Sequence, residues 1–331
     1  MINQILGTLY GMAIGDAMGM PSELWSRQKV KDFFGEIKTF LDGPSENEVA
    51  YQYTQGQFTD DTAQALIVLD SLIEQNFQFI PKDFVQKLLT WAEKENAFEK
   101  NILGPSSKAA LLGIQAGKDI QAITNQAQTN GAAMRIAPIG CLFDPSQKEE
   151  LIELVSQISK VTHNSDVTIA GACMIAAAVC AAMVYDDFND ILNFVYSVEA
   201  PARALGCETI NPSLAARTAL GVEIAQKYQG DDEKFLEAIY QIIGAGVLMS
   251  ESVPVALSIA YYAQNVEHCS LLCANLGGDT DTIGAMACAI CGAYHGYDRI
   301  NSSFIQQIEI ANAVDFMFYS LKLNEARRNI R

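Results

Sequence analysis

Apolar residues recur at intervals of three and four positions along most of this chain. The pattern is clear in three segments: Leu66, Leu69 and Ile73; Phe84, Leu88 and Trp91; and Leu151, Leu154, Val155 and Ile158. This spacing places the apolar side chains on one face of an α-helix. Segments that alternate apolar and polar residues are scarce, and Asn130-Gly131, a pair typical of hairpin turns, is followed by a helix-like sequence. The chain is therefore predicted to be all-α.

Residues that commonly begin helices stand at the start of three apolar segments. They are Asp60 with Thr62, Pro81 with Asp83, and Pro105 with Ser106 and Ser107. Short polar side chains accept hydrogen bonds from the free amides of a first turn, and proline fits the first helical position. We therefore expect helices to begin close to residues 60, 81 and 105.

The stretch from about 25 to 58 lacks this regularity. It has weak periodicity and several helix-breaking residues, and it is predicted to be a long surface loop able to act as a flap. No linker-like tract, low-complexity block or fixed-period repeat divides the chain. With 331 residues, of which 50% are hydrophobic, residues 1–331 are expected to form one domain with a large core.

The charge balance excludes some functions. Lys and Arg number 22 against 39 Asp and Glu, the net charge is -17, and no basic run is present. Such a surface repels polyanions, so general nucleic-acid binding is not expected. The eight cysteines have no disulfide-framework spacing, and the first residues lack the basic region of a signal peptide. We expect reduced thiols and a cytoplasmic location.

The longest uncharged run, Val167–Tyr185, has about the length of a membrane span, which is roughly 20 residues. It is rich in Ala, Gly and Cys rather than in Leu and Phe. A helix with such small side chains suits the packed centre of a helical protein, where backbones approach closely. No membrane association is therefore expected.

Two acidic clusters stand at the start of apolar segments, residues 59–62 (Thr-Asp-Asp-Thr) and 279–282 (Asp-Thr-Asp-Thr). Carboxylate and hydroxyl oxygens are hard ligands that select Mg²⁺, Mn²⁺ or Ca²⁺. If the clusters converged, two divalent ions roughly 3.5 to 4 Å apart would neutralise them and activate water. Helix capping explains each cluster on its own. The repetition of one arrangement, beside Gly277-Gly278, favours a shared metal site.

Several segments, in the same order along the chain, resemble motifs of the ADP-ribosylglycohydrolase family. They are residues 7–17, 59–62, 104–107, 130–138, 162–163, 251–257 and 276–284, the last reading Leu-Gly-Gly-Asp-Thr-Asp-Thr-Ile-Gly. The resemblance runs nearly end to end. It implies a compact, mostly orthogonal multi-helix bundle with a dinuclear centre holding Mg²⁺ or Mn²⁺, and hydrolysis of a glycosidic bond to ADP-ribose.

The resemblance also implies roles for individual residues. The metal ligands would be Thr59, Asp60, Asp61, Asp279, Asp281 and Thr282. Glu23 falls where the family has an acidic residue on a mobile segment beside the metals, which implies a gating or base role. Glu23, Asp61 or Asp281 would accept the proton of the attacking water. The substrate would be bound by Gly104, Ser106, Ser107, Asn130, Gly131 and His163. The alternatives are a solvated loop acid for Glu23 and a helix-capping residue for His163.

Other polar residues are expected to be structural. Asp16 would orient a neighbouring helix end, and Arg135 would neutralise an acid behind the metal ligands. Four cysteines, Cys269, Cys273, Cys288 and Cys291, have helical spacing inside apolar segments and are predicted to belong to the core.

The resemblance leaves the acceptor open. ADP-ribosylated arginine or serine side chains, a nucleic-acid end, and small ADP-ribosyl or ribosyl metabolites are all compatible with the motifs. A catalytically silent relative that binds ADP-ribose or serves a structural role is the remaining alternative. The retention of all six implied ligands argues against a silent relative.

Overall fold

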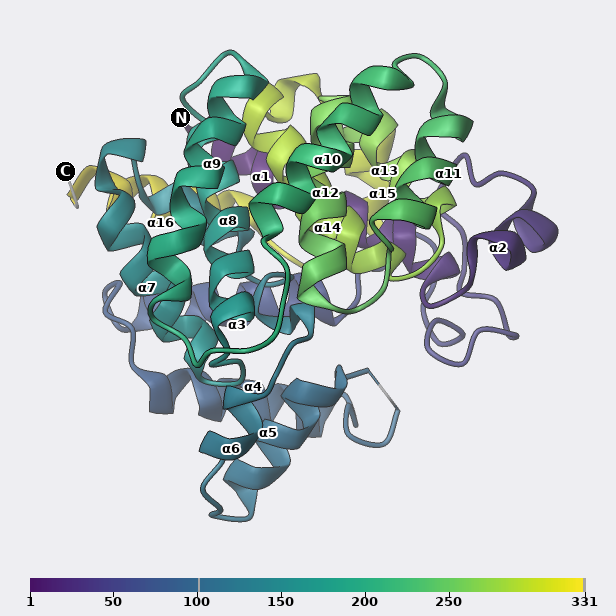
Figure 1. Cartoon of the computed structure of the whole chain (residues 1–331). Coiled ribbons are helices and arrows are strands. Elements are labelled where there is room, and N and C mark those ends of the chain that lie inside the picture. The colour runs from purple at the N-terminus through teal and green to yellow at the C-terminus, as the bar shows by residue number, and fades with distance from the viewer. Residues whose placement is uncertain (101, 330–331) are drawn as a thin grey trace.

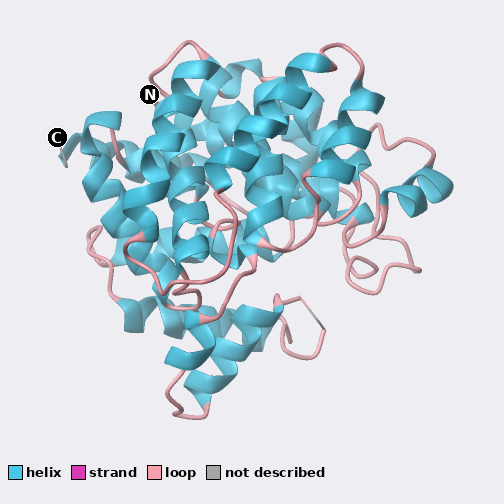
Figure 2. Cartoon of the chain, in the orientation of Figure 1, coloured by secondary structure: helices cyan, strands magenta, loops and turns pink. Residues whose placement is uncertain are grey.

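The computed structural model describes residues 1–100 and 102–329, and the regular elements of this part of the chain are helices (Figure 2). Short 3₁₀ turns and three isolated β-bridges accompany them. The α-helices are α1 Ile2–Gly19, α2 Arg27–Phe34, α3 Asp60–Glu74, α4 Pro81–Lys94, α5 Pro105–Gln115, α6 Gln121–Asn125, α7 Lys148–Lys160, α8 Asp166–Ala182, α9 Phe188–Arg203, α10 Leu214–Lys227, α11 Asp232–Ile242, α12 Met249–Ala263, α13 Val266–Leu276, α14 Thr280–His295, α15 Ser302–Ala311 and α16 Phe316–Asn329. The all-α prediction is confirmed.

Three helix starts fall where the sequence predicts them. α3 begins at Asp60, and the side chain of Thr59 accepts a hydrogen bond from the amide of Asp61. α4 begins at Pro81 and α5 at Pro105, each with proline in the first turn. In Figure 1, α4, α5 and α6 lie below the larger body that contains α1, α8, α12 and α14.

The uncharged run predicted to be a central helix forms α8. Every residue of α8 is buried, and the helix packs against α7, α9, α12 and α14. Its small side chains allow these neighbours to approach from all sides. Among the described residues, no helix is both long enough and apolar enough to cross a membrane.

The closest helix contact is between α1 and α14. A Cβ added to Gly15 would lie 2.0 Å from the carbonyl oxygen of Gly284, and one added to Gly284 would lie 2.3 Å from that of Gly15. Glycine is therefore required on both sides of the contact. The contact brings the end of α1 against the start of α14, and both helices contribute acids to the site described below.

The predicted loop at 25–58 needs a correction, because it contains the helix α2. Arg27 opens this helix and is buried, with its guanidinium 2.9 Å from Glu233 and 3.0 Å from Glu237 of α11. A short polar helix held by such ion pairs has little apolar periodicity of its own. Residues 35–58, all of them described, form turns and loops.

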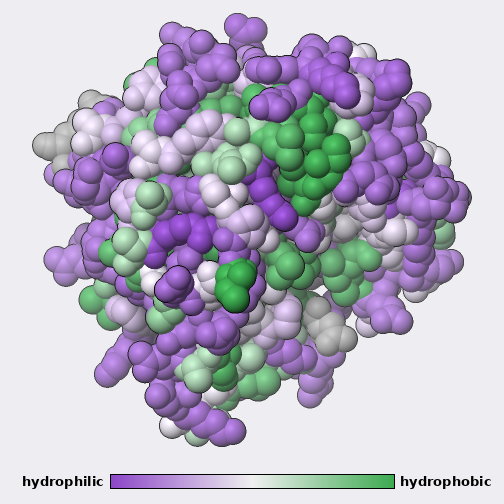
Figure 3. Space-filling model, viewed as in Figure 1, coloured by the Kyte–Doolittle hydropathy of each residue, from purple (hydrophilic) through white to green (hydrophobic). Residues whose placement is uncertain are grey.

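The surface agrees with the acidic composition. On the face shown in Figure 3, hydrophilic side chains predominate, and hydrophobic side chains gather in a few separate patches. The eight cysteines are free, and seven of them are buried. The prediction that Cys269, Cys273, Cys288 and Cys291 are core residues is confirmed.

Candidate active site

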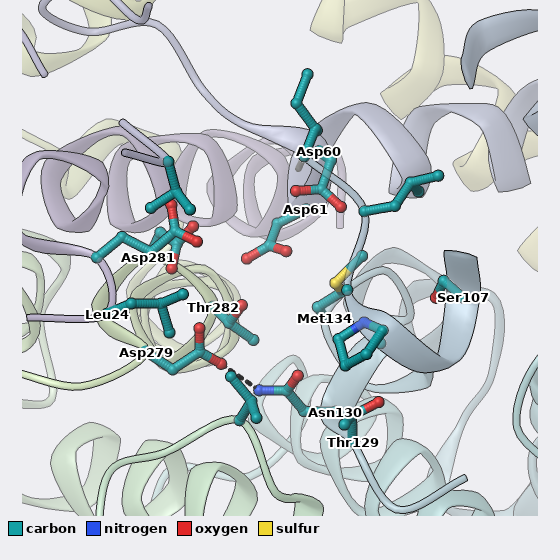
Figure 4. Close-up of a pocket in the computed structure, with 18 residues that line it drawn as sticks. Leu24, Asp60, Asp61, Ser107, Thr129, Asn130, Met134, Asp279, Asp281 and Thr282 are labelled. Carbon is teal, nitrogen blue, oxygen red and sulfur yellow. Dashed lines mark hydrogen bonds between the residues drawn. The ribbon is translucent and has the colours of Figure 1, made fainter. Parts of the chain in front are cut away.

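Carboxylates from three segments of the chain converge on one cavity (Figure 4). Asp60 and Asp61 stand in the first turn of α3, while Asp279 and Asp281 stand at the start of α14. Glu23 follows the 3₁₀ turn that ends α1. A helix N-terminus carries partial positive charge, so both helix ends favour carboxylates at this place.

The acidic group is close enough to share a cation. Glu23, Asp279 and Asp281 each offer a carboxylate oxygen within 4.8 Å of the others. The remaining predicted ligands surround this trio: Asp60, Asp61 and Thr282 line the cavity, and Thr59 Oγ1 lies 3.5 Å from Asp281 Oδ2. The resemblance gave Glu23 a role in gating or proton transfer rather than in metal binding, whereas the structure places its carboxylate inside the acidic group.

Helix capping does not account for these acids. Thr59 supplies the side-chain cap of α3, and Asp279 makes no side-chain cap at α14. Asp16, from α1, accepts hydrogen bonds from the amides of Thr59 and Thr62 at 2.9 and 3.0 Å, so it orients the end of α3 as predicted. Asp61 Oδ2 is buried without a hydrogen-bond partner, and so is the Oδ1 atom of Asp281. Such orphaned oxygens suit a bound cation.

Burial and mutual repulsion raise the pKa of these carboxyls. Burial, followed by the charge of Asp16, raises the pKa of Asp60 to about 8. Burial raises the pKa of Asp279 to about 6. The pKa values of Asp61 and Asp281 lie well above the usual range, first through burial and then through neighbouring acids. A divalent cation would favour the ionised forms, so the donors and their electrostatics fit a hard metal.

The main chain beside Glu23 pairs with that of Gly278. The amide of Leu24 donates to Gly278 O, and the amide of Gly278 donates to Trp25 O, each at 2.7 Å. Gly278 has a φ of 88°, and a Cβ added there would lie 2.0 Å from the carbonyl oxygen of Ala245. Only glycine fits, so the predicted close backbone approach at this site is confirmed.

The other wall of the cavity carries small residues. The cavity has a volume of about 330 Å³, and four of the six predicted substrate-binding residues line it: Gly104, Ser107, Asn130 and Gly131. Pro105, the first residue of α5, also lines the cavity, and a helix N-terminus offers free amides to an anion. Asn130 Nδ2 donates to Asp279 Oδ2 at 2.5 Å, which joins this wall to the acids (Figure 4).

Ser106 and His163 are not among the residues that line the cavity, so their contact with substrate stays a prediction. His163 is buried, with Nδ1 2.8 Å from Thr162 Oγ1 and Nε2 3.1 Å from Thr129 Oγ1. Thr129 donates to Ser106 Oγ at 2.9 Å. Burial, with the charge of Arg135, lowers the pKa of His163 to about 3, so the ring is neutral. His163 therefore supports Thr129, which lines the cavity.

Sequence reasoning missed two residues of this region. Gln64 donates to Asp60 Oδ2 at 2.8 Å and accepts from Arg135 at 3.0 Å, so Arg135 reaches the acid through Gln64 rather than directly. Gln64 lies four residues after Asp60, a spacing that places both on one helix face and could have revealed it. Thr129 had no sequence signal, because a single threonine outside a motif does not indicate a place in the site.

A second cavity, of about 510 Å³, adjoins the first. Asp60 and Ile102 line both cavities. Four aromatic side chains line the second one, Tyr53, Phe58, Trp91 and Tyr319. The acidic group thus faces a small-residue wall on one side and an aromatic cavity on the other.

The sequence matches the family model described as ADP-ribosylglycohydrolase over residues 1–327. The chain belongs to the ADP-ribosylglycohydrolase family. An uncharacterized protein of Escherichia coli (strain K12), YegU, is 43% identical over 98% of this chain and 97% of its own length. The ADP-ribosylarginine hydrolase Tri1 of Pseudomonas putida (strain GB-1) is 26% identical over 93% of this chain and 74% of its own length.

A solved structure, described as an ADP-ribosylglycohydrolase-related protein complex, has the same fold. Its TM-score is 0.72 at 23% identity, and the likeness covers 98% of each chain. This agreement confirms the predicted fold class, and the family makes the chain a glycosidase-type hydrolase. ADP-ribosylglycohydrolases act on ADP-ribosylated substrates. In this member, the acidic group and the small-residue wall face each other across one cavity.

Proposed function

We propose that this ADP-ribosylglycohydrolase cleaves the glycosidic bond between ADP-ribose and an acceptor, such as an arginine or serine side chain, with two divalent cations, Mg²⁺ or Mn²⁺. The proposed ligands are Thr59, Asp60, Asp61, Asp279, Asp281 and Thr282. One observation carries the proposal: buried carboxylates with unpartnered oxygens face the small-residue wall at the start of α5 across a single cavity.

Each part of the cavity has a task in this reaction. The free amides at the start of α5 and the backbone of Gly131 would hold the diphosphate. The cations, when bound, would grip the ribose hydroxyls and polarise a water molecule. Glu23, Asp61 or Asp281 would accept the proton of that water, and a protonated carboxyl would assist the departing acceptor.

The proposal is tested by release of ADP-ribose. Chelator-treated protein is reloaded with Mg²⁺ or Mn²⁺ and incubated with ADP-ribosylated arginine and serine peptides. We expect release by the wild type and none by Asp281→Ala, while Asp190→Ala, which removes an exposed acid of α9, serves as the matched control. Full activity of metal-stripped protein, or of Asp281→Ala, contradicts the scheme.

The aromatic cavity beyond Asp60 suits the acceptor side of the bond. Its rings could stack on a planar guanidinium or pack against a peptide. Trp91→Ala should then raise the KM for the ADP-ribosylated peptide while leaving the affinity for ADP-ribose itself unchanged. If Trp91→Ala weakens ADP-ribose binding as much as it raises the KM for the peptide, Trp91 does not bind the acceptor specifically.

Two other functions have defined outcomes in the same assay. Release from a small ADP-ribosyl or ribosyl compound, but not from peptides, would identify a metabolite hydrolase. Binding of ADP-ribose without release from any substrate would identify a silent relative.

A further inference from the structure

A continuous chain of hydrogen bonds runs behind the cavity and begins at the acidic group. Gln64 Nε2 donates to Asp60 Oδ2 at 2.8 Å, and Arg135 Nη1 donates to Gln64 Oε1 at 3.0 Å. On its other side, Arg135 Nη2 donates to Thr162 Oγ1 at 2.6 Å. One guanidinium therefore reaches two different segments of the site.

From Thr162 the chain continues to the opposite wall. A guanidinium only donates hydrogen bonds, so the Thr162 hydroxyl accepts from Arg135. The same hydroxyl can then donate a hydrogen bond to His163 Nδ1 at 2.8 Å. The neutral imidazole then carries its proton on Nε2 and donates to Thr129 Oγ1 at 3.1 Å. Thr129 donates to Ser106 Oγ at 2.9 Å. Every donor in both directions thus points away from Arg135.

Burying the charged guanidinium of Arg135 costs desolvation free energy. Arg135 is fully buried, and its hydrogen-bond partners Gln64 and Thr162 are both neutral. Its Cζ atom lies 5.3 Å from the centre of the Phe84 ring, and its Nε atom has no hydrogen-bond partner. Burial lowers its pKa to about 10. Apolar side chains of similar volume often stabilise a core better than buried charges do. The position therefore points to a role besides stability.

We propose that Arg135 is a positioning residue that orients both walls of the site from one guanidinium. Through Gln64 it turns Asp60 so that one carboxylate oxygen is held and the other is free for a cation. Through Thr162 and His163 it orients Thr129 on the wall that would face the diphosphate. The metal side of this inference rests on the proposed metal centre, and the diphosphate side rests on the proposed substrate.

The two sides can be tested separately. Gln64→Leu removes the link to Asp60, and Thr162→Val removes the hydroxyl while keeping the shape, whereas Thr162→Ser keeps the hydroxyl. Thr218→Val is the matched control, because Thr218 is equally buried and bonds only within α10, at Leu214 O. Mn²⁺ and then ADP-ribose are titrated calorimetrically into each full-length variant, and thermal melting is recorded alongside.

We expect Gln64→Leu to weaken Mn²⁺ binding about tenfold, the lower end of the effect of residues that orient metal ligands. Thr162→Val should weaken ADP-ribose binding about tenfold, and Thr162→Ser should restore it to within about twofold. Arg135→Lys should weaken both, because one ammonium cannot span both partners. If Gln64→Leu and Thr162→Val only lower the melting temperature, as Thr218→Val does, the proposal is wrong.

The outcomes also separate this inference from the proposed function. If the wild type releases no ADP-ribose from any substrate, the proposed function fails, yet the Mn²⁺ titration of Gln64→Leu still decides the metal side. If the wild type is active and both affinities are unchanged in Gln64→Leu and Thr162→Val, only the positioning role of Arg135 is overturned. A Thr162→Val variant that does not fold is replaced by Thr162→Ala, and a Gln64→Leu variant that does not fold is replaced by Gln64→Met, which also lacks the N–H that donates to Asp60.

Discussion

Replacing Asp60 by Asn should stabilise the metal-free protein at alkaline pH and abolish its response to metal. Burial, followed by the charge of Asp16, raises the pKa of Asp60 from its ordinary value of 3.8 to about 8 in the folded protein. Between these two values the folded state binds more protons than the unfolded state does. The free energy of unfolding therefore falls as the pH rises from about 4 to 8.

The size of the effect follows from the pKa shift. A shift of about 4 units at about 1.36 kcal/mol per unit makes the cost on the order of 5 kcal/mol at pH 8. A domain of 331 residues has an unfolding entropy of roughly 0.7 kcal/mol/K, so this cost lowers the melting temperature by about 7 °C. Asp60→Asn removes the charge but keeps the shape, so it should recover most of that difference at pH 8 and very little at pH 4.

Thermal melting of the chelator-treated wild type and Asp60→Asn between pH 4 and pH 8 measures the predicted difference in melting temperature. Mn²⁺ at 100 times its Kd should recover about half of the free-energy cost for the wild type at pH 8, because such a ligand stabilises by about 2.7 kcal/mol, and it should do nothing for Asp60→Asn. A wild-type melting temperature that does not change with pH would refute the reasoning. So would an Asp60→Asn variant that is less stable than the metal-free wild type at pH 8.

Two further predictions concern the fold. Gly15→Ala should lower the free energy of unfolding by at least about 3 kcal/mol, because the new methyl group meets the backbone of α14. Gly104→Ala is the control: no atom lies within 4 Å of an added Cβ, so the free energy of unfolding should change by less than about 0.5 kcal/mol. A denaturant titration measures both. A thiol reagent should modify Cys207 alone in the native protein and all eight cysteines after denaturation, because the other seven are buried; rapid native reaction of a second thiol would contradict the packing of the core.

The sequence predicts helices well where a periodic apolar face meets a clear start signal. α3, α4 and α5 begin at the expected residues because a capping threonine or a first-turn proline acts locally. α2 was missed for the opposite reason. Ser26 caps this short helix, but a serine alone is a weak start signal. The ion pairs of Arg27 with α11 join residues about 200 positions apart, and no local pattern reveals such a contact.

The same limit applies to the candidate site. Acidic clusters beside glycines pointed to Asp61 and Asp281, because carboxylates are ligands that hard cations prefer. The residue type of His163 shows that it can bind a phosphate, but not that two threonine hydroxyls lie within hydrogen-bond distance of its ring nitrogens. Sequence motifs therefore indicate which residues belong to the site, while tertiary contacts decide which of them face the cavity.

The glycines of α1 explain how two distant acidic clusters form one site. Added Cβ atoms at Gly7, Gly11, Gly15 and Gly19 would each meet the backbone of α14 or of the Gly296 turn that follows it, within 2.9 Å. This stripe, one glycine per helical turn, lets α1 lie directly against α14. Asp16 stands on α1 between the last two glycines and holds the start of α3, while Asp281 stands at the start of α14. The separation of the clusters is thus set by the α1–α14 contact, so a substitution in the stripe should weaken metal binding even though no glycine is a ligand.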